Sequence, residues 1–279
     1  MAYDFKYEHF NSIYDFEKAV NGRSVNEYFT NYEKSHQKDT SWTKTESYDE
    51  AQNLLMNGWS TEIENIDREL RKFTSTIQVK RNKQIKSVAG HAPCVPNAIR
   101  GVPKSMIATK VVKKNEKKRA VHIILNNTAS GGTQSDELMQ SGMTVLKLAY
   151  VLDRMGVRTK IDVIPKMSIK DKSCYGCTVS IKDYRQPFNL SKIAYPLAHV
   201  SFFRRHGFRY FETMEGFSNS DMAATYGSSM MNWKGEKIAD EYFKFAGFMK
   251  DDVVYIDLTD VRNADFDYVK LAENKGIAL

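Results

Sequence analysis

The stretch Ala120-Val-His-Ile-Ile-Leu-Asn-Asn-Thr-Ala-Ser-Gly-Gly132 joins a buried strand to a polar loop, and the expected fold class depends on this junction. Its first half, Ala120–Leu125, is apolar and rich in β-branched residues, which is typical of a buried strand. Its second half is polar and ends in two glycines, which free the backbone to turn. The chain is therefore expected to change from strand to loop at Asn126.

A helix and a second strand follow this loop. From Asp136 the apolar residues recur at helical spacing until Gly156, a residue type that commonly ends helices. Arg158–Ile164 then has the pattern of another strand. Strand, helix and strand form a βαβ unit, whose strands are parallel and whose ligands bind at the strand carboxyl ends. The expected fold class is α/β, with a mostly parallel, Rossmann-like sheet flanked by helices.

The pattern predicts three parts along the chain. They are an N-terminal helical segment (residues 1–73), a basic extended arm or β-hairpin (residues 74–119) and an α/β domain (residues 120–279). In the first part, helices are expected over residues 12–20, 24–34, 47–57 and 60–73, the last two forming a helical hairpin. In the second part, closely spaced prolines argue against a long helix, and residues 107–112 are expected to pair with the strand that begins at residue 119.

Composition indicates a protein of a reducing, cytoplasmic compartment with no membrane partner. No apolar run reaches the roughly 18 residues that a membrane span needs, and the acidic N-terminus is unlike a signal peptide. The three cysteines do not form a disulfide framework. Cys174 and Cys177 have the spacing of zinc and redox motifs, although free cysteines also serve as small apolar core residues. The sequence leaves the oligomeric state open.

The net charge of +7 is concentrated in the middle of the chain. Residues 1–67 hold 6 Lys/Arg and 13 Asp/Glu, residues 68–119 hold 15 and 2, and residues 120–279 hold 20 and 19. Such concentration is typical of a surface that binds nucleic acid or another polyanion. It is also typical of a solvated face that balances the acidic N-terminal part. The binding residues expected at the tip of the hairpin are Lys113, Lys114, Lys117 and Lys118.

A second candidate binding site follows a helix expected over residues 190–203. This helix ends in three basic residues, Arg204, Arg205 and His206. The helix dipole favours cations at a helix C-terminus, which is a structural reason for them. Paired arginines also bind phosphate or carboxylate groups. Glu212 is close enough in sequence to neutralise them instead, so both interpretations stay open.

Several stretches resemble a family of uncharacterised phage and prophage proteins. They are Ser47-Tyr-Asp-Glu-Ala51 with Gly58-Trp59, Val88-Ala-Gly-His-Ala-Pro-Cys-Val-Pro96, Gly101-Val-Pro-Lys-Ser-Met106 and His199-Val-Ser-Phe-Phe-Arg-Arg205. The resemblance covers roughly residues 45–215. It implies a bacteriophage context, with the host cytoplasm or the virion as the location, and no established chemistry.

The central unit separately resembles a von Willebrand factor A domain, in which a strand ends in Asp-x-Ser-x-Ser and these side chains help coordinate Mg²⁺. The matching positions here are Asn126, Thr128 and Ser130, and Asp171 is a candidate for an additional carboxylate. A hard divalent cation prefers carboxylate oxygens, so a neutral Asn in the leading position removes the anchoring anion. The resemblance implies either a magnesium site at these four residues or a degenerate domain that keeps the fold without the ion.

The sequence favours a binding protein over an enzyme, because no Ser/His/Asp, paired-carboxylate or zinc-hydrolase pattern is present. The first hypothesis is a phage-encoded, non-enzymatic binding protein with a degenerate von Willebrand A-like domain that engages a host or virion protein. The second is a nucleic-acid-binding protein that uses residues 68–119. The third is a metal-dependent phosphoryl-transfer enzyme that uses Asn126, Ser130, Asp171 and Asp257.

Overall fold

A five-stranded sheet forms the centre of the molecule, in the order β1-β7-β6-β5-β8. The computed structural model describes residues 4–30, 33–38, 40–59, 67–68, 71, 84–109, 120–129, 132–170, 173–218, 235–247, 253–277 and 279. The strands are β1 (Asp4–Phe10), β5 (Ala120–Asn126), β6 (Arg158–Lys170), β7 (Ser173–Lys182) and β8 (Val253–Asp257). Neighbouring strands are parallel except for β6 and β7, which are antiparallel. The expected α/β class with a mostly parallel sheet is confirmed.

The predicted βαβ unit is confirmed as β5, α6 (Ser135–Arg154) and β6. β5 and β6 pair in parallel along the whole of β5, from Ala120 opposite Arg158 to Asn126 opposite Ile164. β5 is the second strand from one edge, and its Ile123, Ile124 and Leu125 are fully buried because helices cover both faces of the sheet. Asn126 therefore stands at the carboxyl end of an inner strand.

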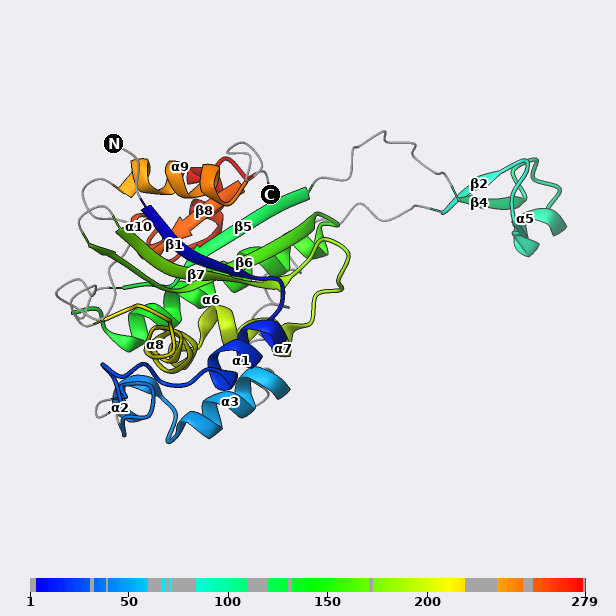
Figure 1. The fold of residues 1–279 in the computed structure, drawn as a ribbon. Coiled ribbons are helices and arrows are strands. Elements are labelled where there is room, and N and C mark those ends of the chain that lie inside the picture. The colour runs from blue at the N-terminus through cyan, green and yellow to red at the C-terminus, as the bar shows by residue number, and fades with distance from the viewer. Residues whose placement is uncertain are drawn as a thin grey trace.

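Helices cover the sheet on both faces (Figure 1). One face packs against α6, α7 (Leu190–Ala198) and α8 (Gly207–Glu212), and α9 (Gly235–Phe245) covers the other. The remaining helices are α1 (Ile13–Gly22), α2 (Thr40–Thr43), α3 (Tyr48–Asn57), the π-helix η1 (Phe202–His206), α10 (Leu258–Asn263) and α11 (Tyr268–Asn274). Among the described residues, no helix is both long and apolar enough to cross a membrane.

The first described element is the strand β1, so the prediction of an N-terminal helical segment over residues 1–73 is wrong at residues 4–10. β1 is an edge strand of the main sheet and pairs in parallel with β7, from Asp4 opposite Ser173 to Phe10 opposite Val179. The rings of Phe5 and Tyr7 pack against α9, with Phe5 stacked on Phe245. This strand forms because distant parts of the chain cover it, and such tertiary pairing overrides local propensity.

Two of the predicted N-terminal helices are confirmed as α1 and α3. Ser12 and Ser47 cap them by accepting hydrogen bonds from the backbone N–H groups three residues later. The helix predicted over residues 24–34 is wrong, since residues 24–30 form a loop and a turn. Asn26 ties this loop to the end of α8, because its N–H donates to the carbonyl of Glu212 at 2.7 Å. The helix predicted over residues 60–73 lies almost wholly outside the described residues.

A second, three-stranded antiparallel sheet has the order β2-β4-β3. It consists of β2 (Gln84–Ser87), β3 (Ala92–Pro93) and β4 (Met106–Thr109), together with the short helix α5 (Val95–Ile99). We call residues 84–109 the small module, which Figure 1 shows apart from the main sheet. β5 has β6 and β8 on its two sides, so the predicted hairpin between residues 107–112 and the central strand is wrong.

Candidate functional site

Two polar residues meet at the carboxyl ends of β5 and β8. Asn126 and Asp257 are register partners on these parallel strands, and both are buried. The Asn126 side chain donates to the Tyr255 hydroxyl at 2.8 Å and accepts from the Thr128 N–H at 2.9 Å. Asn126 thus closes the turn that begins the loop after β5. The predicted gathering of polar groups at this edge is present in Asn126, Thr128 and Asp257, whereas Ser130 and Asp171 lie outside the described residues.

Asp257 caps α10 at the same edge. Its Oδ1 accepts from the N–H groups of Thr259 and Asp260, at 2.8 and 3.1 Å, and Asp260 Oδ2 accepts from the Asp257 N–H at 3.0 Å. This reciprocal arrangement is a capping box. Burial, with the nearby Asp260 carboxylate, raises the pKa of Asp257 to about 6. Its second oxygen, Oδ2, is buried and has no hydrogen-bond partner.

The described part of this edge does not by itself form a magnesium site. Two buried oxygens there have no hydrogen-bond partner, Thr128 Oγ1 and Asp257 Oδ2. Magnesium requires an octahedral set of oxygen ligands. No group of three or more His, Cys, Asp or Glu side chains that could hold a metal occurs among the described residues. The magnesium site at Asn126, Thr128, Ser130 and Asp171 stays a prediction.

The three basic residues after α7 lie on the π-helix η1 and have different surroundings. Arg205 is 1% exposed and donates five hydrogen bonds to the segment before α3, at distances of 2.7–3.3 Å. His206 is fully buried, and burial lowers the pKa of its imidazole to about 3. Arg204 instead lies over the Trp42 ring, 3.4 Å from its centre.

Arg205 therefore holds residues 35–45 against η1, a structural use of its charge. The nearby Glu212 is also buried, and it accepts hydrogen bonds from the N–H and hydroxyl of Ser35, the former at 3.0 Å. The prediction that Arg204, Arg205 and His206 bind a phosphate or carboxylate ligand stays a prediction.

Cys174 and Cys177 lie on β7, and both are fully buried. Because side chains alternate along a strand, residues three positions apart face opposite sides of the sheet. Each cysteine accordingly belongs to a different apolar cluster, one on each face. Burial raises the pKa of the Cys174 thiol to about 12 and also raises that of Cys177. Both behave as apolar core residues rather than as a shared zinc or redox site.

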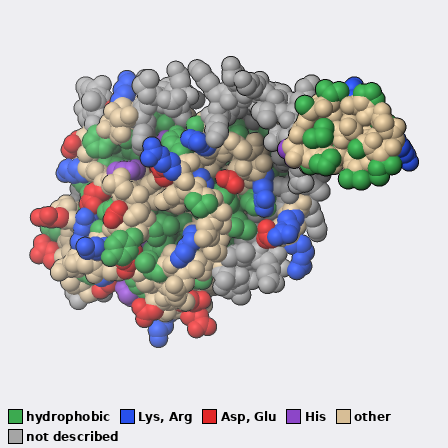
Figure 2. Space-filling model, turned by 90° about the vertical axis from the view of Figure 1, so that its right-hand side faces the viewer, with side chains coloured by type: hydrophobic (Ala, Val, Ile, Leu, Met, Phe, Trp, Pro, Cys, Tyr) green, Lys and Arg blue, Asp and Glu red, His purple; other side chains and the backbone are tan. Residues whose placement is uncertain are grey.

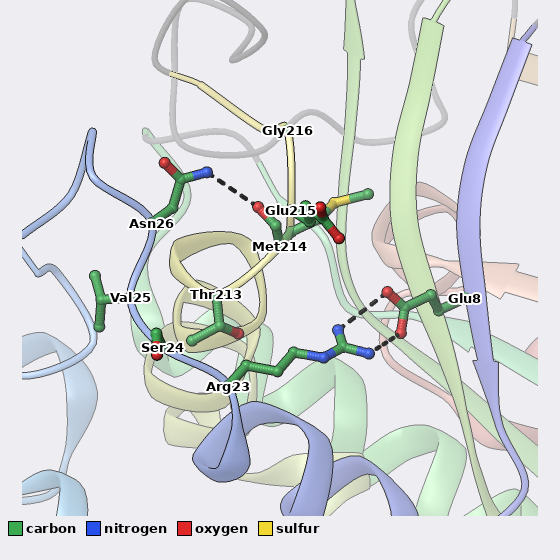
Figure 3. Close-up of a pocket in the computed structure, with 9 residues that line it drawn as sticks. All are labelled: Glu8, Arg23, Ser24, Val25, Asn26, Thr213, Met214, Glu215 and Gly216. Carbon is green, nitrogen blue, oxygen red and sulfur yellow. Dashed lines mark hydrogen bonds and ion pairs between the residues drawn. The ribbon is translucent and has the colours of Figure 1, made fainter.

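A hollow of about 500 Å³ lies where β1, the loop after α1 and the turn after α8 meet (Figure 3). Two of the charged side chains at its wall, Arg23 and Glu8, form an ion pair. Arg23 donates to both oxygens of Glu8, at 3.0 and 2.8 Å. Asn26 donates to the Met214 carbonyl at 3.1 Å, as Figure 3 shows. Neutralised in this way, the Arg23 side chain offers little attraction to a charged ligand.

The small module is the most exposed part of the described structure. Its backbone is well ordered by hydrogen bonds, such as those from His91 N–H to Ile107 O at 2.9 Å and from Cys94 N–H to Ser105 O at 2.7 Å. Gly90 fits tightly, since an added Cβ would lie 2.1 Å from Ile107 O. None of the side chains of the module whose exposure is described is buried.

Apolar side chains are spread over the surface of the small module. Val88, Val95 and Ile99 are 70%, 57% and 81% exposed. Figure 2 shows hydrophobic side chains over the surface of the module, with Lys and Arg side chains at its edge. Residues 84–109 contain Lys86, Arg100 and Lys104 but no Asp or Glu, and no Phe, Trp or Tyr. The prediction of an extended arm did not include this surface, although the Val and Ile residues between the prolines were a signal for it.

The predicted lysine cluster at residues 113, 114, 117 and 118 lies outside the described residues. Comparison with known proteins gives one match, to a family model described as "Domain of unknown function (DUF7192)", over residues 5–266. Neither the curated proteins nor the solved structures contain a match to this chain. The family model covers all five strands of the main sheet and the small module.

Proposed function

This chain belongs to the DUF7192 family, and we propose that it is a non-enzymatic binding protein whose small module docks onto an acidic surface of a protein partner. The observation that carries the proposal is the exposure of Val88, Val95 and Ile99 in a module without a buried core. Several exposed apolar side chains on one small unit are typical of a surface that binds a partner. Docking would remove this apolar surface from water, which stabilises the complex by roughly 25 cal/mol for each Å² of apolar area buried.

Charge and composition favour a protein as the occupant. The three cations of the module have no acidic counterpart within residues 84–109, so an acidic surface complements them. Single-stranded nucleic acid binds such surfaces largely by stacking bases on aromatic side chains, and the module has no Phe, Trp or Tyr side chain. Apolar anchors with a basic rim resemble the usual anatomy of a protein interface.

The bacteriophage context and a degenerate von Willebrand A-like domain belong to the same proposal. They rest on the sequence resemblance, and they make a host or virion protein the partner to look for. The loop after β5 supports the degenerate form, because Asn126 uses its amide to close a turn. The third hypothesis, metal-dependent phosphoryl transfer, has less support. At the described strand ends, two buried oxygens, Thr128 Oγ1 and Asp257 Oδ2, lack a hydrogen-bond partner. Two oxygens are fewer than the octahedral ligand set that magnesium requires.

Comparative affinity capture tests this proposal. The full-length wild type and the double variant Val95→Asp/Ile99→Asp serve as baits in extracts of cells that express the protein naturally. Val269→Asp is the matched control, because Val269 is an exposed valine (39%) on α11 of the main domain. The captured protein is then purified and titrated against all three baits at increasing salt.

We expect the captured partner to have an acidic surface. The dissociation constant of its complex should be at least about tenfold higher for the double variant than for the wild type, a loss of about 1.4 kcal/mol in binding free energy. For the control it should be unchanged. Equal binding by all three baits would contradict docking through the module. Self-association lost in the double variant, measured by sedimentation, would identify a second copy of this chain as the occupant and overturn the acidic partner.

A further inference from the structure

A second hollow lies at the end of the sheet opposite to Asn126 and Asp257. Its volume is about 520 Å³, and Ala120, Arg158, Asp183, Tyr184 and Arg185 line it. Ala120 and Arg158 are the first residues of β5 and β6 and are register partners. The other three residues directly follow β7, which runs antiparallel to β6. Three strands thus bring this set of side chains together from separate parts of the chain.

The two arginines of this hollow differ from most of the other described arginines of the main domain. Seven of those have an identified partner: Arg23 pairs with Glu8, Arg71 with Asp67, Arg154 with Tyr150, Arg204 with Trp42, Arg205 with residues 35–45, Arg209 with Glu33 and Arg262 with Glu137. The guanidinium groups of Arg158 and Arg185 make no such contact with a described side chain. Both are exposed and border the same hollow.

The wall behind these arginines is fixed by hydrogen bonds. Lys182 is 3% exposed, and its ammonium donates to the carbonyls of Thr159 at 2.8 Å and Asp183 at 3.3 Å. Asp183 Oδ1 accepts a hydrogen bond from the backbone N–H of Arg185 at 3.0 Å. Lys182 therefore adds a third positive charge close to the hollow, and Asp183 is the acidic side chain in its lining. The balance of charge at the hollow is positive.

The geometry points to a phosphate site for a single-stranded nucleic acid, and we propose that Arg158 and Arg185 bind its backbone. A guanidinium has a planar fork of N–H donors that matches phosphate oxygens, and two free forks at one hollow can hold one or two phosphates. Tyr184 supplies an aromatic ring at the same hollow, on which a base can stack. The small module lacks such a ring, so the two surfaces are distinct.

The two guanidinium groups and the Tyr184 ring at one hollow favour a strand over a mononucleotide. A strand offers more than one phosphate to the two arginines and a base to the ring, and neutralising several phosphates together strengthens binding. The proposal is independent of the docking function of the small module.

Fluorescence anisotropy with labelled single-stranded DNA and RNA, over a range of salt concentrations, tests the proposal. The test variant is Arg158→Ala/Arg185→Ala in the full chain. The control is Arg154→Ala, an exposed arginine at the end of α6 that already contacts Tyr150. Thermal unfolding of each variant checks that folding is retained, which is expected because neither guanidinium group has a hydrogen bond or ion pair with a described residue and both side chains are exposed.

We expect the wild type to bind single strands, and the double variant to bind at least tenfold more weakly. For two lost phosphate contacts, the slope of log affinity against log salt should fall by about 1.4, since each contact on a single strand contributes about 0.7. Arg154→Ala should bind like the wild type.

Three results would overturn the proposal. One is a wild type that binds no single strand at low salt. Another is a double variant with unchanged affinity, which would assign any binding to residues 68–119 alone. The third is competition by a nucleoside monophosphate or by inorganic phosphate that is as strong as competition by an unlabelled strand at the same phosphate concentration. This result would make the hollow a small-anion site.

Discussion

Arg205 donates from Nε to the hydroxyl of Thr45 at 2.7 Å, and both residues are buried. The same hydroxyl lies 2.6 Å from Ser201 Oγ, next to the π-helix. Other N–H groups of Arg205 reach the carbonyls of Ser35, Gln37 and Thr45. One guanidinium therefore joins residues 35, 37 and 45, which lie on both sides of the short helix α2, to η1, and in this way holds residues 35–45 in place.

Replacing Arg205 should strongly destabilise the fold. In Arg205→Ala several buried carbonyls and hydroxyls lose their donor, and unpaired buried polar groups are costly. We expect the free energy of unfolding to fall by about 3 kcal/mol, measured by urea denaturation. Arg204→Ala is the neighbouring control, which should cost about 1 kcal/mol for the lost contact with Trp42. Equal, small losses in both variants would contradict the structural use of Arg205.

The raised pKa of Asp257 should make stability depend on pH. An aspartate in an unfolded chain titrates near pH 4, whereas burial raises the pKa of Asp257 to about 6 in the folded protein. Between these pH values the folded state binds more protons, so the free energy of unfolding falls as the pH rises. Above about pH 6 this loss is complete and is on the order of 2 kcal/mol.

Asp257→Asn isolates this effect, because asparagine also caps helices and does not titrate there. Relative to the wild type, the variant should gain on the order of 2 kcal/mol in unfolding free energy between pH 4 and pH 7. Urea denaturation at several pH values measures the difference. A difference that does not vary with pH would contradict the raised pKa.

Thr128→Val should stabilise the protein, because the buried Thr128 hydroxyl has no hydrogen-bond partner. A methyl group of similar shape removes the cost of burying that hydroxyl, a gain of about 1 kcal/mol. Thr144→Val is the matched control. The Thr144 hydroxyl lies 2.9 Å from the Gln140 carbonyl and 3.1 Å from the Phe266 carbonyl. That substitution should cost about 1 kcal/mol.

Calorimetric titration of the same Thr128 variant tests the magnesium interpretation. We expect no saturable heat from Mg²⁺ or Mn²⁺ with either the wild type or Thr128→Val. Heat that appears with the wild type and disappears in Thr128→Val and Asn126→Ala would establish a metal site at the end of β5. It would also contradict the degenerate form of the domain.

Gly90→Ala should unfold the small module and leave the main domain intact. The added Cβ would lie 2.1 Å from Ile107 O, a backbone atom that cannot give way easily. Hydrogen exchange at the amides of His91 and Cys94 should lose protection, because both donate across the module. Gly22→Ala is the control, since nothing lies within 4 Å of its added Cβ. Unchanged protection at His91 would show that the module tolerates the clash.

Local patterns predicted the elements that depend on local interactions. The βαβ unit, α1 and α3 follow from apolar periodicity and from Ser caps at residues 12 and 47. The capping box of Asp257 and Asp260 likewise joins residues that are only three positions apart. These features were predictable because the residues that determine them are close in sequence.

Elements that depend on distant partners escaped prediction. β1 is half-buried by β7 and α9, and its alternation of Phe5 and Tyr7 with charged residues was the signal that could have indicated a strand. The hollow at Arg158 and Arg185 requires the register of β5 with β6 and the end of β7. Which arginines have partners is a tertiary property, so sequence patterns could not distinguish these two.

Photo-crosslinking tests most directly whether the small module docks onto an acidic surface of a protein partner. A benzophenone amino acid replaces Ile99 in the full chain, and the same group at Val269 is the control. We expect the group at position 99 to form an adduct with one partner, and mass spectrometry to map this adduct to an acidic surface of that partner. The group at position 269 should form no adduct. Equal adducts from both positions, or an adduct at position 99 with another copy of this chain, would contradict it.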